Sequence, residues 1–198
     1  METEENMLKD VLVFLKDHLN QNLRPGAALA ADNSVEETVV FVDGDKMDPV
    51  TFKSGAVSVL LINVEEENTL RRADRFVGVG ANGEAVRINP DIRMNLYVLF
   101  VARYKDYETG LSQLSRIVGH FQNHRVFDRQ NAPELAEEIE KLTLELITLP
   151  LSEQNDLWNA LRTAYHPSVL YKVGTIIFRD ADGRAPVELS EKAVQTSQ

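Results

Sequence analysis

The sequence contains no cysteine, which excludes disulfide bonds and any metal or catalytic site that needs a thiolate. It also lacks a hydrophobic run long enough to span a bilayer. The chain begins Met-Glu-Thr-Glu-Glu, whereas a secretory signal peptide begins with basic residues. These absences predict a protein without a membrane span that folds without covalent cross-links, as proteins of reducing compartments do.

Basic residues are scarce relative to acidic ones. The 21 Lys and Arg side chains stand against 31 Asp and Glu, for a formal net charge of −10. This charge repels phosphate backbones, so nucleic acid is not an expected partner. The length of 198 residues suits one domain. We expect that domain to span residues 7–180, between a disordered N-terminus at 1–6 and an extended polar tail at 181–198.

The stretch Ile92–Tyr104 has the two-residue period of a β-strand, and the rest of the chain is expected to pack around it. One register is apolar throughout: Ile92, Met94, Leu96, Val98, Phe100, Ala102 and Tyr104. The other register is apolar only in its middle. This pattern predicts a central strand that is buried on one face and partly covered on the other. At its full length of about 43 Å, the strand must bend or project beyond its sheet.

Apolar residues at intervals of three and four predict three helices, within residues 7–19, 111–121 and 152–161. Asp106 or Thr109 is expected to cap the second helix, and Ser152 the third. A short helix is expected from Asn131, which has capping-box spacing to Glu134. Further strands are expected at residues 39–42, 56–64, 85–88, 142–147 and 169–177.

The order of these elements lacks a strict βαβ rhythm. It therefore predicts the α+β class, in a single domain. We expect a mixed, largely antiparallel sheet with the helices packed on one face.

One glycine-rich motif raises the possibility of a nucleotide site. Gly78, Gly80 and Gly83 match the dinucleotide pattern G-x-G-x-x-G. That pattern requires a helix after the glycines, so that amide groups point at the pyrophosphate. Here residues 84–88 are strand-like and Pro90 follows. This context favours a flexible loop over a cofactor site, and no cofactor is expected.

Two histidines, His120 and His124, lie four residues apart and share one face of the second helix. They could hold a metal if Asp128 or His166 supplied a third ligand. Because both histidines flank the apolar stripe of their helix, the interpretation favoured here is a structural border rather than a metal site. No metal is therefore expected.

The acidic run Glu65–Glu67 follows the strand predicted at 56–64. Paired carboxylates can carry out acid–base chemistry or bind a cation, and an enzyme could combine them with His120 or His124. A ligand-binding module that uses this region is a further alternative. A charge run at the end of a strand is more often simply solvated. No catalytic residue is therefore assigned.

Several short segments, taken in order, carry a family resemblance. They include Leu19-Asn20-Gln21-Asn22-Leu23, the strand that ends Asn63-Val64-Glu65-Glu66-Glu67, and the strand that begins His166-Pro167-Ser168-Val169-Leu170-Tyr171. With their spacing, these segments resemble the N-terminal domain of tail-terminator, or cap, proteins of phage-tail-like contractile injection systems. The particles concerned are of the antifeeding-prophage and Photorhabdus-virulence-cassette type. The resemblance covers about residues 7–180.

The resemblance implies a structural protein with no chemistry and no cofactor. It implies a ring of six copies at the distal end of the particle, which ends the inner tube and holds the last layer of sheath. Such a protein would be assembled in the bacterial cytoplasm and would remain in the mature, extracellular particle. The stretch 68–90 is the candidate contact with tube or neighbouring subunits, through Arg71, Arg72, Arg75 and Phe76.

Overall fold

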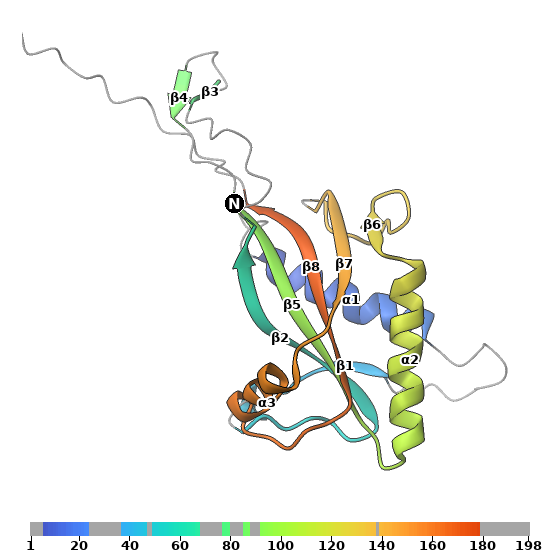
Figure 1. The fold of residues 1–198 in the computed structure, drawn as a ribbon. Helices are drawn as coiled ribbons and strands as arrows, with labels where there is room; N and C mark the ends of the chain where they lie inside the picture. Colours follow the sequence, from blue (N-terminus) through green and yellow to red (C-terminus); the bar gives the residue numbers. More distant parts are fainter. Residues whose placement is uncertain are drawn as a thin grey trace, which may run out of the picture.

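A computed structural model describes residues 6–23, 37–46, 49–67, 77–79, 85–87, 92–137 and 139–178. Figure 1 shows the elements along the chain. They are α1 (Met7–Asn22), β1 (Val39–Phe41), the 3-10 turn η2 (Gly44–Lys46), β2 (Ala56–Glu66), β3 (Val77–Val79), β4 (Ala85–Arg87), β5 (Ile92–Arg103), α2 (Tyr107–Asn123), β6 (Val126–Asp128), β7 (Lys141–Ile147), α3 (Leu151–Ala160) and β8 (Ser168–Phe178).

The main sheet has six strands in the order β1-β2-β5-β8-β7-β6. Only the pairing of β1 with β2 is parallel, so the predicted mixed, largely antiparallel sheet is confirmed. The predicted central strand is β5, which lies between β2 and β8. Both of its ends remain paired, since Ile92 lies opposite Phe178 and Arg103 opposite Ala56. The long strands therefore bend together, as Figure 1 shows, and β5 does not project alone.

Two irregularities interrupt the long ladders. The β2–β5 register shifts between Leu61 and Asn63, and the β5–β8 register shifts between Met94 and Leu96. Such bulges insert an unpaired residue and increase the local twist and bend of a strand. The bend of the sheet thus has a local cause.

The first face of the sheet is covered by α1 and α2, which enclose the larger core. Phe100 on β5 meets Phe121 on α2 at 5.8 Å between ring centroids, and Phe121 meets Tyr171 on β8 at 5.0 Å. From α1, the fully buried Val11 and Leu15 join the same core. The register of β5 that is apolar throughout in the sequence therefore faces these two helices.

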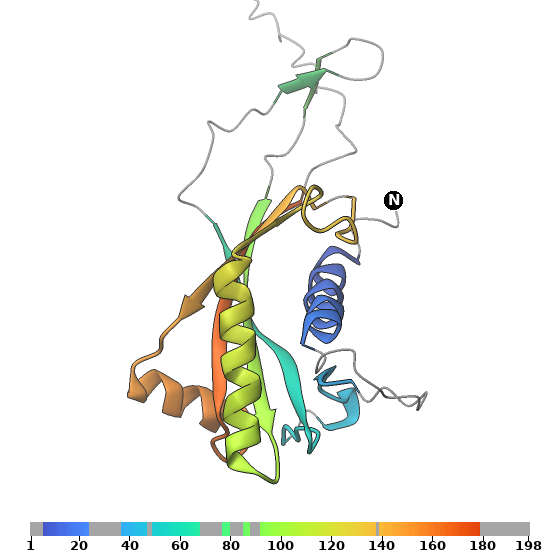
Figure 2. The ribbon, with the colours of Figure 1, turned by 90° about the vertical axis from the view of Figure 1, so that its right-hand side faces the viewer.

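The opposite face is covered in part by α3, which lies across the sheet from α1 (Figure 2). Trp158, only 5% exposed, packs there with Phe52, Leu99, Val101 and Leu170. The expectation that the helices pack on one face thus holds for α1 and α2 and needs correction for α3. The apolar middle of the second β5 register supplies the surface that α3 buries.

Side chains at the turns decide where elements begin. As expected, Asp106 caps α2 by accepting a hydrogen bond from the Thr109 N–H at 2.9 Å. Ser152, by contrast, is not a cap, because α3 begins at Leu151 with Pro150 in the N-cap position.

The helix predicted from Asn131 is wrong, because the chain forms turns there. The Asn131 side chain accepts the Asp128 N–H at 3.0 Å and donates to the Val126 carbonyl at 2.9 Å. A side chain that bonds its own neighbourhood in this way competes with a helix for the backbone.

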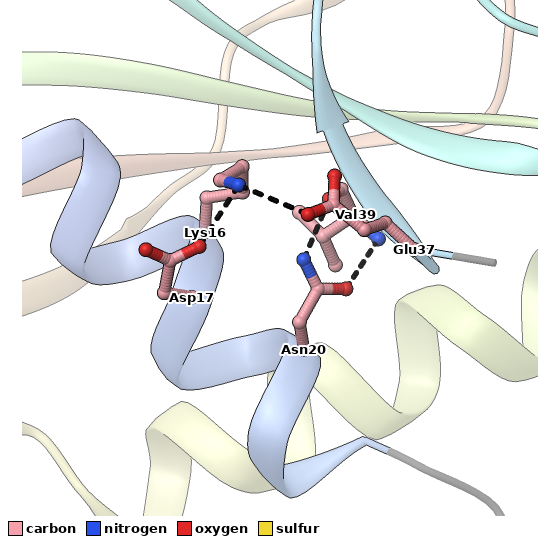
Figure 3. A network of polar contacts seen from close by, with 5 residues as sticks. All are labelled: Lys16, Asp17, Asn20, Glu37 and Val39. Carbon is pink, nitrogen blue, oxygen red and sulfur yellow. Dashed lines mark hydrogen bonds and ion pairs between the residues drawn. The ribbon is translucent and has the colours of Figure 1, made fainter. Parts of the chain in front are cut away.

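A side-chain amide on α1 bonds the edge strand β1, as Figure 3 shows. The Asn20 side chain donates to the Val39 carbonyl at 2.8 Å and accepts the Val39 N–H at 2.9 Å. It thereby occupies the place that a further strand would take beside β1. Next to it, the Lys16 ammonium lies 2.8 Å from Asp17 and 3.3 Å from Glu37, which joins the same two segments.

The chain segment that connects β2 to β5 contains a small second sheet. It pairs β3 with β4 antiparallel, with Val77 opposite Arg87. The strand expected at 85–88 is thereby confirmed as β4. Gly78 lies inside β3, so the glycine pattern opens within a strand, and residues 85–87 that follow it form a strand as well, where a nucleotide motif needs a helix. Among the described helices, none is long and apolar enough to cross a membrane.

Candidate functional site

Polar side chains from β2, β5 and β8 meet on the part of the sheet that α3 leaves uncovered. The Tyr97 hydroxyl donates to Glu65 Oε2 at 2.7 Å. The Lys172 ammonium lies 3.5 Å from the same oxygen and 3.9 Å from Glu67 Oε2. It also lies 6.0 Å from the centroid of the Tyr97 ring. The acidic run singled out in the sequence is therefore part of a network across three neighbouring strands.

The electrostatics of this network keep the Tyr97 phenol protonated. The hydrogen bond to Glu65 raises the pKa of Tyr97 most, followed by burial and by the carboxylates of Glu65, Glu145 and Glu67. A phenol with a raised pKa donates a hydrogen bond but is a poor base near neutral pH. The arrangement therefore suits cross-strand bonding better than proton abstraction.

Asn95 anchors the buried end of the network. It is 3% exposed, and its side-chain amide donates to Glu67 Oε2 at 2.8 Å. Gly174 on β8 makes room for it, because a Cβ at that position would lie 2.6 Å from Asn95 Oδ1. Thr143 on β7 donates to the Gly174 carbonyl at 3.0 Å. Sequence reasoning missed Asn95 and Gly174, although a glycine inside a strand is a known sign of close packing.

A second polar cluster lies between α1 and α2 on the other face. His18, 9% exposed, bonds through Nδ1 to Glu134 Oε1 at 2.9 Å. Its ring lies 5.1 Å from that of His120, which in turn stacks on His124 at 4.5 Å. The sequence indicated the pair His120 and His124 but missed His18 and Glu134. The one available sign was that His18 falls on the apolar stripe of α1.

Electrostatics within this cluster oppose charge on His120. Burial first, and then the neighbouring His124 and His18, lower the pKa of His120 to about 4. The hydrogen bond with His18 lowers the pKa of Glu134. Within the described part of the chain, no group of three or more His, Asp or Glu side chains could hold a metal ion.

The proposed third metal ligands also lie elsewhere. His166 packs on the α3 side, with ring centroids 5.7 Å from Phe52 and 6.0 Å from Trp158. Asp128 Oδ1 accepts the backbone N–H groups of Gln130 at 2.9 Å and Asn131 at 3.2 Å, as in a turn.

The enzyme hypothesis required Glu65–Glu67 to meet His120 or His124. The carboxylates lie with Tyr97 on the α3 face, whereas His120 lies on α2 beside Phe121 of the core on the opposite face. The sheet thus separates the two groups. This combination of residues is therefore not assembled into a site.

The candidate contact residues Arg71, Arg72, Arg75 and Phe76 lie outside the described residues. The structure does define the points between which they are inserted. Glu66 at the end of β2 lies opposite Met94 near the start of β5. The segment therefore leaves and re-enters the sheet at the same end, on adjacent strands.

Comparison with known proteins gives a family and a shared fold. The family model described as the Pvc16 N-terminal domain matches residues 10–189. The PVC sheath/tube terminator of an extracellular contractile injection system, in its extended state, superposes with a TM-score of 0.54 at 19% identity. That match covers 96% of this chain and 63% of the terminator, so the chain spans less than two thirds of that protein.

A second solved structure is the anti-feeding prophage cap, described as tube-terminating. Its TM-score is 0.46 at 18% identity, and the match covers 72% of this chain and 49% of the cap. No curated protein matches the chain.

Proposed function

The chain belongs to the Pvc16 N-terminal domain family, and we propose that it is a structural terminator of a contractile injection system. In this role it ends the inner tube and anchors the last layer of sheath. The observation that carries the proposal is the family match over residues 10–189. The fold shared with a sheath/tube terminator supports it.

The proposal includes the assembly that such a role requires. The chain forms a ring, of six copies, at the distal end of the particle and contacts both tube and sheath subunits. Assembly takes place in the bacterial cytoplasm, and the ring remains in the extracellular particle. The polar networks support a structural role, because their hydrogen bonds join one element of the same chain to another.

We assign the contact with tube or neighbouring subunits to the inserted segment between β2 and β5. Its β3–β4 pair has three residues in each strand. A two-stranded sheet of this size is marginal by itself, so a second surface would stabilise it. Arg71, Arg72, Arg75 and Phe76 remain the proposed contact residues of this segment.

Deleting the gene in its host and imaging the particles by electron microscopy tests the terminator role. We expect tubes of uncontrolled length, or sheath detached from the tube end. The measurement is the distribution of tube and sheath lengths in deleted and complemented strains. Particles of normal length and with intact ends in the deleted strain would refute the proposal.

The assignment of the inserted segment needs a separate test with a matched control. Reversing the three arginines to glutamate should prevent complementation while the purified protein keeps its melting temperature. The control reverses Lys9 and Lys105, which are exposed and lie on or near helices of the main domain. If the arginine variant complements as fully as the control, the segment is not the contact.

A further inference from the structure

Two histidines meet across the packing of α1 against α2 with buried nitrogens that lack partners. Within the described residues, neither His18 Nε2 nor His120 Nε2 has a hydrogen-bond partner. The ring centroids are 5.1 Å apart, at an interplanar angle of 53°. Buried polar atoms are nearly always bonded, so a pair of unbonded nitrogens at one interface needs an explanation.

Groups from four elements surround the pair. Phe14 on α1 stacks on His18 at 5.3 Å, and Phe127 on β6 meets it edge-on at 4.8 Å. Glu134, in the turn before β7, bonds His18 Nδ1, and His124, the C-cap residue of α2, stacks on His120. The charged or titratable groups that face the two rings are thus one carboxylate and one further imidazole.

The surroundings of the pair oppose a proton on His120. A proton on His120 is placed between two imidazoles in a partly buried site, and the one carboxylate of the cluster is already bonded to His18. Consistent with this geometry, burial and the two neighbouring histidines lower the pKa of His120 to about 4.

We propose that the contact between His18 and His120 is an acid-sensitive catch, in which protonation of His120 loosens the packing of α1 on α2 while the sheet stays folded. The sheet stays folded because its core is apolar. Fully buried residues such as Val11 and Leu15 keep α1 attached to that core. The opened form binds a proton that the closed form excludes, so acid favours opening. This inference is independent of the proposed function.

Amide hydrogen exchange on the full chain tests the catch. With His120 titrating normally in the opened form and near pH 4 in the closed form, opening should increase about 30-fold between pH 7.5 and pH 5. We expect this increase, after correction for intrinsic exchange, at the ends of α1 and α2 near the two rings. Amides of β5 should show no such increase. Equal protection of the helix ends at both pH values would overturn the proposal.

Two variants test whether His120 causes the increase in amide exchange at low pH. His120→Gln should abolish most of the acid response, whereas His124→Gln, which removes only one of the two neighbouring imidazoles, should retain part of it. An acid response that persists in His120→Gln would overturn the proposal. If that variant does not fold, NMR titration of the wild-type His120 ring decides: a midpoint below pH 5 supports the proposal, and a midpoint at pH 5 or above refutes it.

Discussion

Replacing Asn20 by alanine should release β1 from α1 and lower the free energy of unfolding by about 2 kcal/mol. The side chain makes two hydrogen bonds to Val39, at 2.8 and 2.9 Å, in a partly buried setting. Each neutral hydrogen bond contributes about 1 kcal/mol net, and both are lost in this variant. For a chain of this length, the loss corresponds to a decrease in melting temperature of about 4–8 °C.

Urea denaturation followed by circular dichroism measures the loss, and amide exchange at Val39 localises it. The matched control is Asn22→Ala, which removes one hydrogen bond, from Asn22 to the His18 carbonyl at 2.8 Å, and does not touch β1. We expect about half the effect in the control and unchanged exchange at Val39. If Asn20→Ala unfolds at the wild-type urea concentration with Val39 still protected, the amide does not fix the strand.

Three further changes probe the face of the sheet on which α3 lies. Gly174→Ala should displace Asn95 and cost about 1–3 kcal/mol, because the new Cβ would lie 2.6 Å from Asn95 Oδ1; wild-type stability in a chemical denaturation series would contradict this. Trp158→Ala should cost about 3–5 kcal/mol by emptying the core beneath α3, measured in the same way, and a loss below 1 kcal/mol would show that α3 contributes little. Glu65→Gln should lower the pKa of Tyr97 towards its ordinary value of 10.0, since the charged acceptor is the largest cause of the shift; an unchanged ultraviolet titration of the phenol would refute that cause.

Local patterns in the sequence were sufficient to predict the central strand and to narrow the cap of α2 to Asp106 or Thr109. Alternation along Ile92–Tyr104 reflects burial on two faces, and the middle of β5 follows it, whereas Ile92 is exposed and Asn95 is buried against the pattern. The Asp106 cap depends on a residue only three positions away. Interactions of this kind depend on residues that are close in the sequence, so they can be predicted without knowledge of the tertiary structure.

Features that depend on distant residues could not be predicted in this way. His18 and Glu134 are separated by 116 positions, and no spacing rule connects them. The sequence also did not show which face of the sheet α3 covers, because Leu99 and Val101 give the second face of β5 an apolar patch as well. The helix predicted from Asn131 failed for another reason, since the same side chain can cap a helix or bond a turn, and the neighbouring Asp128 and Val126 decide between them.

The place of the insertion between β2 and β5 has a consequence for how freely this chain can be changed. The antiparallel ladder continues to the pair Glu66 and Met94, where a tight turn would be enough to join the strands. Lengthening such a connection raises the entropy cost of closing the loop only with the logarithm of its length, by about 1–2 kcal/mol here. We therefore expect the sheet to tolerate a long, a short or a substituted connection without a change in strand register. The segment that carries the proposed contacts is in this sense an exchangeable module, and its sequence can be redesigned for a different partner while the scaffold keeps its own core.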